Sequence, residues 1–88
     1  MYNVYFLKSI KNNKIYTGVT SKEVAQRLYE HNHHSNKFTK ENGPYILLFF
    51  ESYHCSKDAY LRERFYKSGL GRQIRNIIIK YMESIKDL

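Results

Sequence analysis

Two strand-forming segments joined by a polar turn constrain the fold of this chain more than any other feature. Tyr2–Leu7 is rich in aromatic and β-branched residues, and Ile15–Thr20 has a similar character. Between them, Lys11–Lys14 is polar, and its asparagines tolerate the positive φ of a tight turn. The pattern predicts a β-hairpin. Gly18, inside the second segment, indicates a bulge or a close approach to the backbone.

A helix and a third strand are expected after the hairpin. Thr20–Glu23 fits a capping box, which predicts a helix ending near His31 or Asn32. The segment Asn32–Pro44 is polar and contains glycine and proline, so we expect an exposed loop. Tyr45–Tyr53 is nearly continuous in apolar and aromatic residues, which favours a central strand buried on both faces.

Two more helices are expected in the last third of the chain. Ser56 could cap a helix that runs to about Ser68, with Gly69 as its stop. The final helix carries apolar residues at a spacing that predicts one face lying against a core: Ile74, Ile77, Ile78, Tyr81, Met82 and Ile85. The predicted order of elements is β-β-α-β-α-α, an α+β class, in one domain spanning residues 1–88.

The chain is basic, with a formal net charge of +7. Polyanions, nucleic acid first, are its natural partners; the alternative is a soluble protein with a solvated lysine surface. One cysteine cannot form an internal disulfide, which fits a reducing cytoplasm. The apolar runs are too short to span a bilayer, and the start lacks the pattern of a signal peptide. We therefore expect a cytoplasmic protein without a membrane segment.

An arginine and a histidine lie where the first helix should bury apolar residues. At about 100° per residue, Arg27 and His31 border the stripe formed by Val24 and Leu28, whereas Glu30 falls on the opposite side. Buried polar groups are costly, so this placement indicates a function. Four residues apart, Arg27 and His31 can reach one ligand together. The alternative is a satisfied interfacial histidine beside an arginine whose stem packs along the core.

The second helix repeats the anomaly with a glutamate. Glu63 falls between Ala59 and Tyr66, two residues suited to packing. A half-buried carboxylate needs a cation, which could be a metal ion or Arg27. An ion pair with Lys67, four residues on, is the purely structural alternative.

Two tyrosines fall on the strands that are predicted to pair. If their faces match, the phenol oxygens of Tyr5 and Tyr16 converge. A phenol has a pKa of about 10, so a catalytic role requires that this pKa is lowered or that the proton is passed onward. The alternative is packing, the role of most tyrosines in a chain that has nine.

Other segments give weaker signals. Ser68–Arg72 could hold a phosphate at the start of a helix, although a helix stop followed by a new start explains it as well. His33 and His34 lie in a polar segment without a carboxylate or cysteine set, so they do not predict a metal site. Several cations are expected to be solvated, with some available to DNA phosphates: Lys37, Lys40, Lys57, Arg62, Arg64 and Arg75.

Taken in order, these residues resemble a known family. The matching segments are Asn3-Val4-Tyr5, Tyr16-Thr17-Gly18-Val19-Thr20, Arg27-Leu28, His31-Asn32, Pro44, Ala59, Arg62-Glu63 and Lys67-Ser68-Gly69-Leu70-Gly71-Arg72. Together they resemble the GIY-YIG nuclease superfamily, in particular its small stand-alone bacterial proteins of the excinuclease-like type, which are linked to DNA repair. Asn3 replaces the first glycine of the pattern and Thr17 the middle residue of the second motif, and neither change removes a proposed catalytic side chain.

The resemblance implies a three-stranded antiparallel sheet flanked by helices, with the site on the sheet. It also implies roles: Tyr5 and Tyr16 help to activate water, and Arg27 contacts the scissile phosphate. His31 assists proton transfer or phosphate contact, and Glu63 holds one divalent metal ion, Mg²⁺ or Mn²⁺. One glutamate is too few for two metal ions, so a carboxylate-rich two-metal site is not expected.

The leading hypothesis from the sequence is a metal-dependent endonuclease that hydrolyses DNA, with RNA left open as a substrate. Lys67, Arg72, Lys37 and Lys40 are expected to contact the nucleic acid. The alternatives are a nucleic-acid-binding module on the same scaffold with weak or no catalysis, and a basic interaction domain. A protein partner that supplies specificity, and the oligomeric state, are left open.

Overall fold

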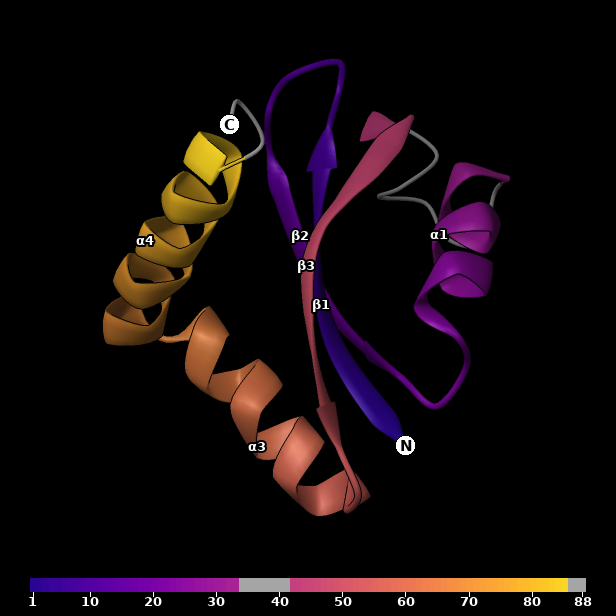
Figure 1. The fold of residues 1–88 in the computed structure, drawn as a ribbon, viewed down its shortest axis with the longest axis vertical. Helices are drawn as coiled ribbons and strands as arrows, with labels where there is room; N and C mark the ends of the chain where they lie inside the picture. Colours follow the sequence, from indigo (N-terminus) through magenta and orange to yellow (C-terminus); the bar gives the residue numbers. More distant parts are fainter. Residues whose placement is uncertain (34–41, 86–88) are drawn as a thin grey trace.

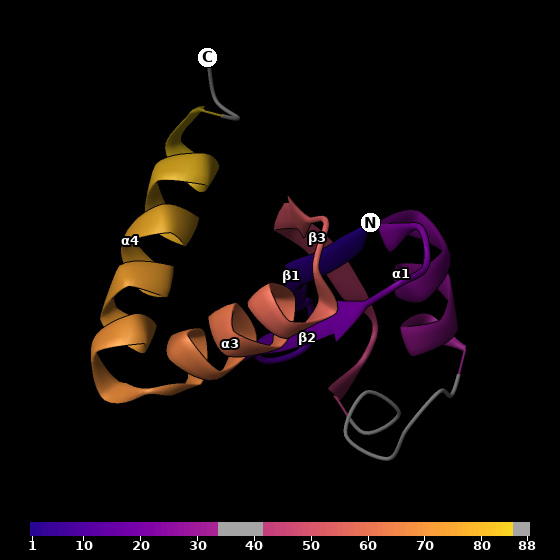
Figure 2. The same cartoon turned by 90° about the horizontal axis from the view of Figure 1, so that it is seen from below.

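A computed structural model of the chain describes residues 1–33 and 42–85. One antiparallel sheet carries three strands in the order β2-β1-β3: β1 (Tyr2–Ser9), β2 (Ile15–Thr20) and β3 (Tyr45–Tyr53). The described helices are α1 (Val24–Asn32), α3 (Ser56–Lys67) and α4 (Gly69–Ile85). The α1 helix covers one face of the sheet, and α3 and α4 cover the other (Figures 1 and 2). The predicted fold class and order of elements are confirmed.

The predicted hairpin forms, and the side chain of its last β1 residue fixes the turn. The buried hydroxyl of Ser9 accepts hydrogen bonds from the backbone N–H groups of Lys11 and Asn12, at 3.1 and 3.2 Å. Asn13 adopts a φ of 62°, the left-handed conformation that asparagine tolerates. The Ser9 side chain therefore satisfies two main-chain donors of the turn.

The prediction that Tyr45–Tyr53 is the central strand is wrong, because β1 occupies that position and pairs with both neighbours. β3 is an edge strand, and its Ile46 and Phe50 side chains are 41% and 48% exposed. A continuous apolar run indicates burial, but it does not say which strand has two hydrogen-bonded neighbours.

Alternate residues of β1 supply two separate cores, because successive side chains of a strand point to opposite faces. Val4 and Phe6 pack toward α3 and α4, with the buried residues Leu48, Ala59, Tyr66 and Ile79. Tyr5 and Leu7 pack toward α1, with Val24 and Tyr45. Tyr5 is therefore part of the α1 core, and its hydroxyl must find a polar partner there.

A polar network fixes α3 on the sheet. Glu51 of β3 accepts hydrogen bonds from the hydroxyls of Tyr53, at 2.5 Å, and Tyr66. Arg62 donates to the Tyr66 oxygen at 2.8 Å and to Glu51 at 3.2 Å, and its guanidinium lies 4.5 Å from the Tyr66 ring centroid. Arg62 was expected to be a solvated charge, but it is part of this network. Because the network sets how α3 is rotated, it also sets where Glu63 points.

The junction between α3 and α4 is a tight helix stop and restart. Ser68 is extended, and its hydroxyl accepts a hydrogen bond from the N–H of Gly71, as an N-cap residue does. A Cβ on Gly71 would collide with the carbonyl of Phe65, so only glycine fits this close approach. The predicted stop at Gly69 is wrong by one residue, because Gly69 already begins α4. These contacts favour the helix-junction explanation of the segment over phosphate binding.

The apolar face of α4 is turned further from the sheet than its spacing predicted. Ile79 is buried, together with Gly71 at the start of the helix, whereas Ile77 and Tyr81 are 68% and 64% exposed. Helical spacing fixes which residues share a face, but packing against the sheet decides how the helix is rotated. Within residues 1–33 and 42–85, no helix has the length and apolar character that a bilayer crossing requires.

The start of α1 also differs from the prediction. The Thr20 hydroxyl accepts a hydrogen bond from the Lys22 N–H at 3.0 Å, which closes a short turn before the helix. The helix itself begins at Val24, and Glu23 at its N-cap makes no side-chain hydrogen bond to the described residues. The predicted capping box is therefore wrong, although the helix that it indicated is present.

Candidate active site

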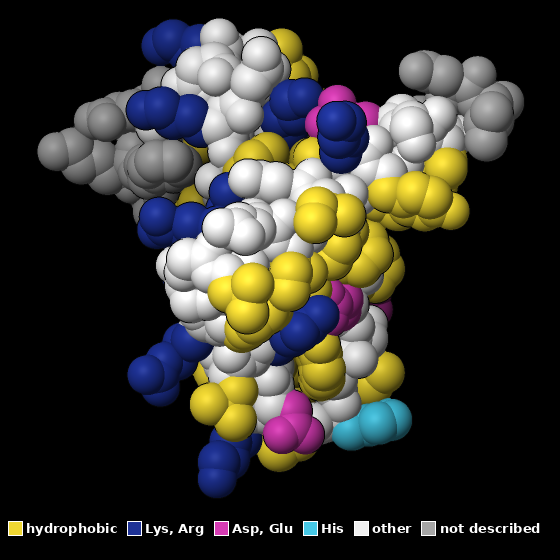
Figure 3. Space-filling view, turned by 90° about the vertical axis from the view of Figure 1, so that its left-hand side faces the viewer, with side chains coloured by type: hydrophobic (Ala, Val, Ile, Leu, Met, Phe, Trp, Pro, Cys, Tyr) yellow, Lys and Arg dark blue, Asp and Glu magenta, His cyan; other side chains and the backbone are white. Residues whose placement is uncertain are grey.

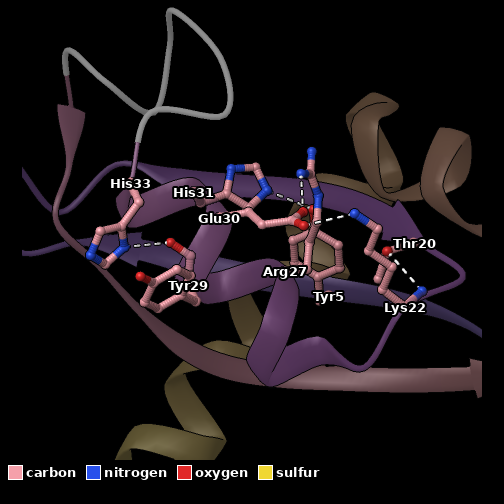
Figure 4. A network of polar contacts seen from close by, with 8 residues as sticks. All are labelled: Tyr5, Thr20, Lys22, Arg27, Tyr29, Glu30, His31 and His33. Atoms are coloured by element: carbon pink, nitrogen blue, oxygen red, sulfur yellow. Dashed lines mark hydrogen bonds and ion pairs between the residues drawn. The ribbon is translucent and has the colours of Figure 1, made fainter.

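Two tyrosines and a histidine meet on the α1 face of the sheet. The Tyr5 hydroxyl lies 2.8 Å from Nε2 of His31, and both side chains are 1% exposed. The ring centroid of Tyr16 lies 4.7 Å from that of His31 and 6.3 Å from that of Tyr5. Figure 4 shows Tyr5 and His31 pointing toward one another. The two strand tyrosines therefore share one face of the hairpin, and the histidine joins them.

Gly18 makes this convergence possible. It lies opposite Tyr5 in the β1–β2 register, and the tyrosine ring leans over it. A Cβ at this position would lie 2.5 Å from the Tyr5 oxygen and 2.9 Å from Cε1 of Tyr16. The close approach predicted for Gly18 is confirmed. The irregularity in the sheet is instead between Phe6 and Leu7, where β1 pairs with β3.

Asn32 positions His31 from the neighbouring place in α1. Its amide oxygen accepts the backbone N–H of Tyr45 at 2.7 Å, and its amide nitrogen donates to the Tyr45 carbonyl at 3.1 Å. The side chain thus extends the hydrogen bonding of β3 and ties the last turn of α1 to the sheet. Nothing in the spacing of Asn32 and Tyr45 predicts this contact, because it joins a side chain to main-chain groups.

Asn3, which replaces the first glycine of the resembled pattern, uses its side chain to connect neighbouring segments. Its amide oxygen accepts the Ser52 hydroxyl at 2.5 Å, and its amide nitrogen donates to the Lys22 carbonyl at 3.3 Å. The substitution therefore links β1 to β3 and to the segment before α1, away from the Tyr5 oxygen.

Arg27 lies beside the Tyr5–His31 pair and is held by a neighbour on the same helix. Its Nη1 donates to the carboxylate of Glu30 at 2.9 Å, and Lys22 binds the same carboxylate at 2.7 Å. Glu30, expected on the far side of the helix, thus curls toward Arg27 (Figure 4). The i, i+3 spacing of Arg27 and Glu30 was the available signal for this pair.

Burial keeps the Tyr5–His31 pair uncharged. It raises the pKa of Tyr5 to about 12, helped by the nearby Tyr16 and opposed by Arg27. Burial, followed by the positive charge of Arg27, lowers the pKa of His31 to about 4. Near pH 7, therefore, a neutral phenol faces a neutral imidazole, and moving a proton from the phenol to the imidazole would create an ion pair unless the phenol oxygen gains a proton at the same time.

Glu63 lies on α3, the helix on the other face of the sheet, and its charge acts on Tyr5. Its side chain is 17% exposed, as its place between Ala59 and Tyr66 predicted, and it lies 3.6 Å from the ammonium of Lys67. The sequence left two ion-pair partners open for Glu63, namely Arg27 and Lys67. The structure forms the pair with Lys67, four residues on, whereas Arg27 pairs with Glu30. The Glu63 charge adds to the raised pKa of Tyr5, so the carboxylate acts on the site electrostatically.

The structure describes only some of the remaining cations that were expected to bind nucleic acid. Lys67 is 53% exposed and pairs with Glu63, and its contact with nucleic acid stays a prediction. Arg72 is exposed at the start of α4. Burial of Arg75 lowers the pKa of that guanidinium, and the nearby charge of Arg72 lowers it further. Lys37 and Lys40, like His34, lie outside the described residues. His33 stacks on Tyr29, with ring centroids 3.9 Å apart.

The fold and the site define a class: a small α+β domain whose hairpin and first helix join two tyrosines, a histidine and an arginine. The sequence matches the family described as the GIY-YIG catalytic domain over residues 1–76. The chain therefore belongs to the GIY-YIG family, a family of endonuclease domains that act on nucleic acids. No curated protein and no solved structure matches the chain. The narrower excinuclease-like type remains a prediction.

Proposed function

We propose that this protein is an endonuclease that hydrolyses DNA phosphodiester bonds with the help of one divalent metal ion. The observation that carries the proposal is the 2.8 Å contact between the Tyr5 hydroxyl and His31, with Arg27 beside it. It pairs a hydroxyl that can give a proton with a ring nitrogen that can take one, next to a cation suited to phosphate.

The Tyr5–His31 pair is assigned the activation of water. With a pKa of about 12, Tyr5 holds its proton near pH 7, so it cannot act as a preformed phenolate. A phenol that donates to neutral His31 still has a lone pair for the attacking water. As water attacks phosphorus, it gives a proton to the Tyr5 oxygen, and Tyr5 passes its own proton to His31. Tyr16, packed against His31, is assigned to orient the water.

Arg27 is assigned the scissile phosphate. A guanidinium offers planar, paired donors that match two phosphate oxygens and stabilise the charge that develops during attack. In the absence of substrate, Glu30 occupies one of these donors. A bound phosphate would replace the carboxylate, or share the guanidinium with it, so Glu30 sets how readily Arg27 is released.

Glu63 is the residue that would hold the metal ion. Its carboxylate is half-buried, and its contact with Lys67 is long, so an incoming cation can compete for it. Residues 1–33 and 42–85 contain no group of three or more His, Cys, Asp or Glu side chains arranged for a metal. A single carboxylate suits Mg²⁺ or Mn²⁺, which keep several water ligands and bind weakly without substrate. When bound, the ion would stabilise negative charge on the leaving oxygen.

Cleavage of branched, single-stranded and duplex DNA, with Mn²⁺, Mg²⁺ or EDTA, tests the proposal. The wild-type protein should cut in the presence of metal, whereas Glu63→Ala and Arg27→Ala should lose activity by about 10²-fold or more. Asp58→Asn, which changes an exposed residue of α3, should retain it. Equal cutting by the wild type and both site variants would refute the assignment.

A second candidate, a nucleic-acid-binding module without turnover, is favoured by the Arg27–Glu30 ion pair. A carboxylate held at 2.9 Å weakens the arginine as a catalytic group while leaving the positive surface intact. Salt-sensitive binding of DNA without metal-dependent cutting would support this candidate.

A further inference from the structure

One face of α4 exposes a row of large apolar side chains. Leu70, Ile77 and Tyr81 are 63%, 68% and 64% exposed, and Ile85 is 37% exposed. Figure 3 shows hydrophobic side chains gathered across this side of the molecule. Contiguous apolar surface on a soluble protein commonly marks an interaction site. We refer to these four residues, with half-buried Ile74, as the α4 face.

The spacing of the α4 face suits another helix. Leu70, Ile74, Ile77 and Tyr81 are separated by four, three and four residues, the pattern by which helices pack in coiled coils. An extended peptide presents its side chains with a period of two residues, and the apolar residues of the α4 face do not follow that period. The partner that fits is therefore an apolar helix lying along α4.

The same spacing is symmetric about the middle of the helix. Leu70 and Ile85 are equally distant in sequence from the point between residues 77 and 78, and so are Ile74 and Tyr81. Two identical α4 helices packed antiparallel would place Leu70 against Ile85 and Ile74 against Tyr81. A surface that complements itself in this way is what a two-fold interface requires.

The charges around the α4 face are compatible with a second copy. The chain has a net charge of +7, so two copies repel one another unless their contact is free of like charges. The α4 face contains no charged residue. A polyanion, by contrast, would find no cation on this face.

We propose that this protein forms a two-fold homodimer through antiparallel packing of α4 around Ile77. The Tyr5–His31 pair lies on the other face of the sheet, so both sites stay open, and the proposal does not depend on nuclease activity. A helix of about 25 Å covers less than the ~800 Å² per partner of a standard interface. The adjoining hollow lined by residues 47–50 and Met82 adds apolar surface. We therefore expect a micromolar dissociation constant.

Sedimentation velocity over a range of protein concentrations tests the dimer. The average mass of the wild type should rise with concentration toward twice that of one chain. Ile77→Glu should weaken the dimer by about 30-fold or more, because a carboxylate would face its own copy at the two-fold axis. Leu61→Glu, which adds the same charge at a 51% exposed position of α3, should dimerise like the wild type.

A mixing experiment separates a second copy from other partners. Ile77→Glu and Ile77→Lys should each be monomeric and folded by circular dichroism, and an equal mixture should dimerise, because opposite charges then meet at the axis. Disulfide cross-linking supplies an independent measurement. In a Cys55→Ser background, Ile77→Cys should cross-link faster than Leu61→Cys. A wild type that stays monomeric at the highest concentration, or association that Ile77→Glu does not weaken, would overturn the proposal.

Discussion

The hydroxyl of Tyr5 and Nε2 of His31 lie 2.8 Å apart although 26 positions separate the two residues in the chain. One belongs to the central strand, and the other to the last turn of the helix that covers it. The contact is buried, and both groups are held neutral near pH 7 by their surroundings. It therefore joins the fold to the proposed chemistry, and the predictions that follow depend on it.

Removing the Tyr5 hydroxyl should separate catalysis from folding. Tyr5→Phe keeps the buried ring and loses the oxygen that would accept the proton of water, so cleavage should slow by about 10²–10⁴-fold. Stability should fall by only about 1 kcal/mol, the usual contribution of one hydrogen bond. Tyr29→Phe, which changes an exposed tyrosine of α1, serves as the control. Single-turnover cleavage rates check the prediction, and an unchanged rate for Tyr5→Phe would contradict it.

Acid should destabilise the protein through His31. Because burial lowers its pKa from 6.5 to about 4 in the folded state, the unfolded state binds more protons between these values. Stability is therefore complete above pH 6.5 and falls as the pH drops toward about 4. Between pH 7.5 and pH 5 the contribution amounts to about 2 kcal/mol.

Urea unfolding of the wild type and His31→Gln at the two pH values measures this effect. The variant lacks the titrating group, so its stability should change less with pH, by about 2 kcal/mol. Titration of His31 by NMR gives the pKa directly. Identical pH dependence in the two proteins, or a pKa near 6.5, would show that burial does not control this histidine.

Releasing Arg27 from Glu30 should strengthen the binding of DNA. Glu30→Gln removes the carboxylate that Arg27 contacts at 2.9 Å, so the guanidinium becomes available to phosphate. The salt dependence should steepen by about one unit of slope, as expected for one more phosphate contact. Fluorescence anisotropy at several salt concentrations provides the measurement.

Glu83→Gln is the matched control for Glu30→Gln, because it makes the same change in net charge at a residue that pairs with Lys8. It should leave the slope nearer to that of the wild type. In an Arg27→Ala background, Glu30→Gln should lose most of its effect. An equal gain from Glu30→Gln and Glu83→Gln would indicate that net charge alone is responsible.

Gly18→Ala should disturb the site through packing alone. The added methyl group would lie 2.5 Å from the Tyr5 oxygen, so the tyrosine must move away from His31. We expect a loss of about 1–3 kcal/mol in stability, typical of overpacking, together with slower cleavage. Gly69→Ala is the matched control, because its Cβ would meet nothing within 4 Å. Thermal unfolding and cleavage assays on both variants decide the matter, and a Gly18→Ala protein as stable and active as the wild type would exclude this role for the glycine.

Much of the fold follows from local patterns in the sequence. The hairpin depends on strand-forming residues around an asparagine turn, and Asn13 adopts the predicted positive φ. The positions of Arg27, His31 and Glu63 beside apolar residues also follow from helical spacing, and the structure finds all three at least partly buried. The contacts of Asn32 with Tyr45 and of Arg62 with Glu51 could not be predicted, because these partners lie 13 and 11 residues away in another element.

The sequence by itself determined the order of elements, the residues that share each helix face and the residues able to do chemistry. These are properties of neighbouring positions, set by backbone geometry and side-chain periodicity. Only the tertiary structure decided that β1 is the central strand and that α4 turns Ile77 outward. Strand pairing and helix rotation depend on how surfaces that are distant in the sequence fit together, and the local periodicity of the sequence does not determine that fit.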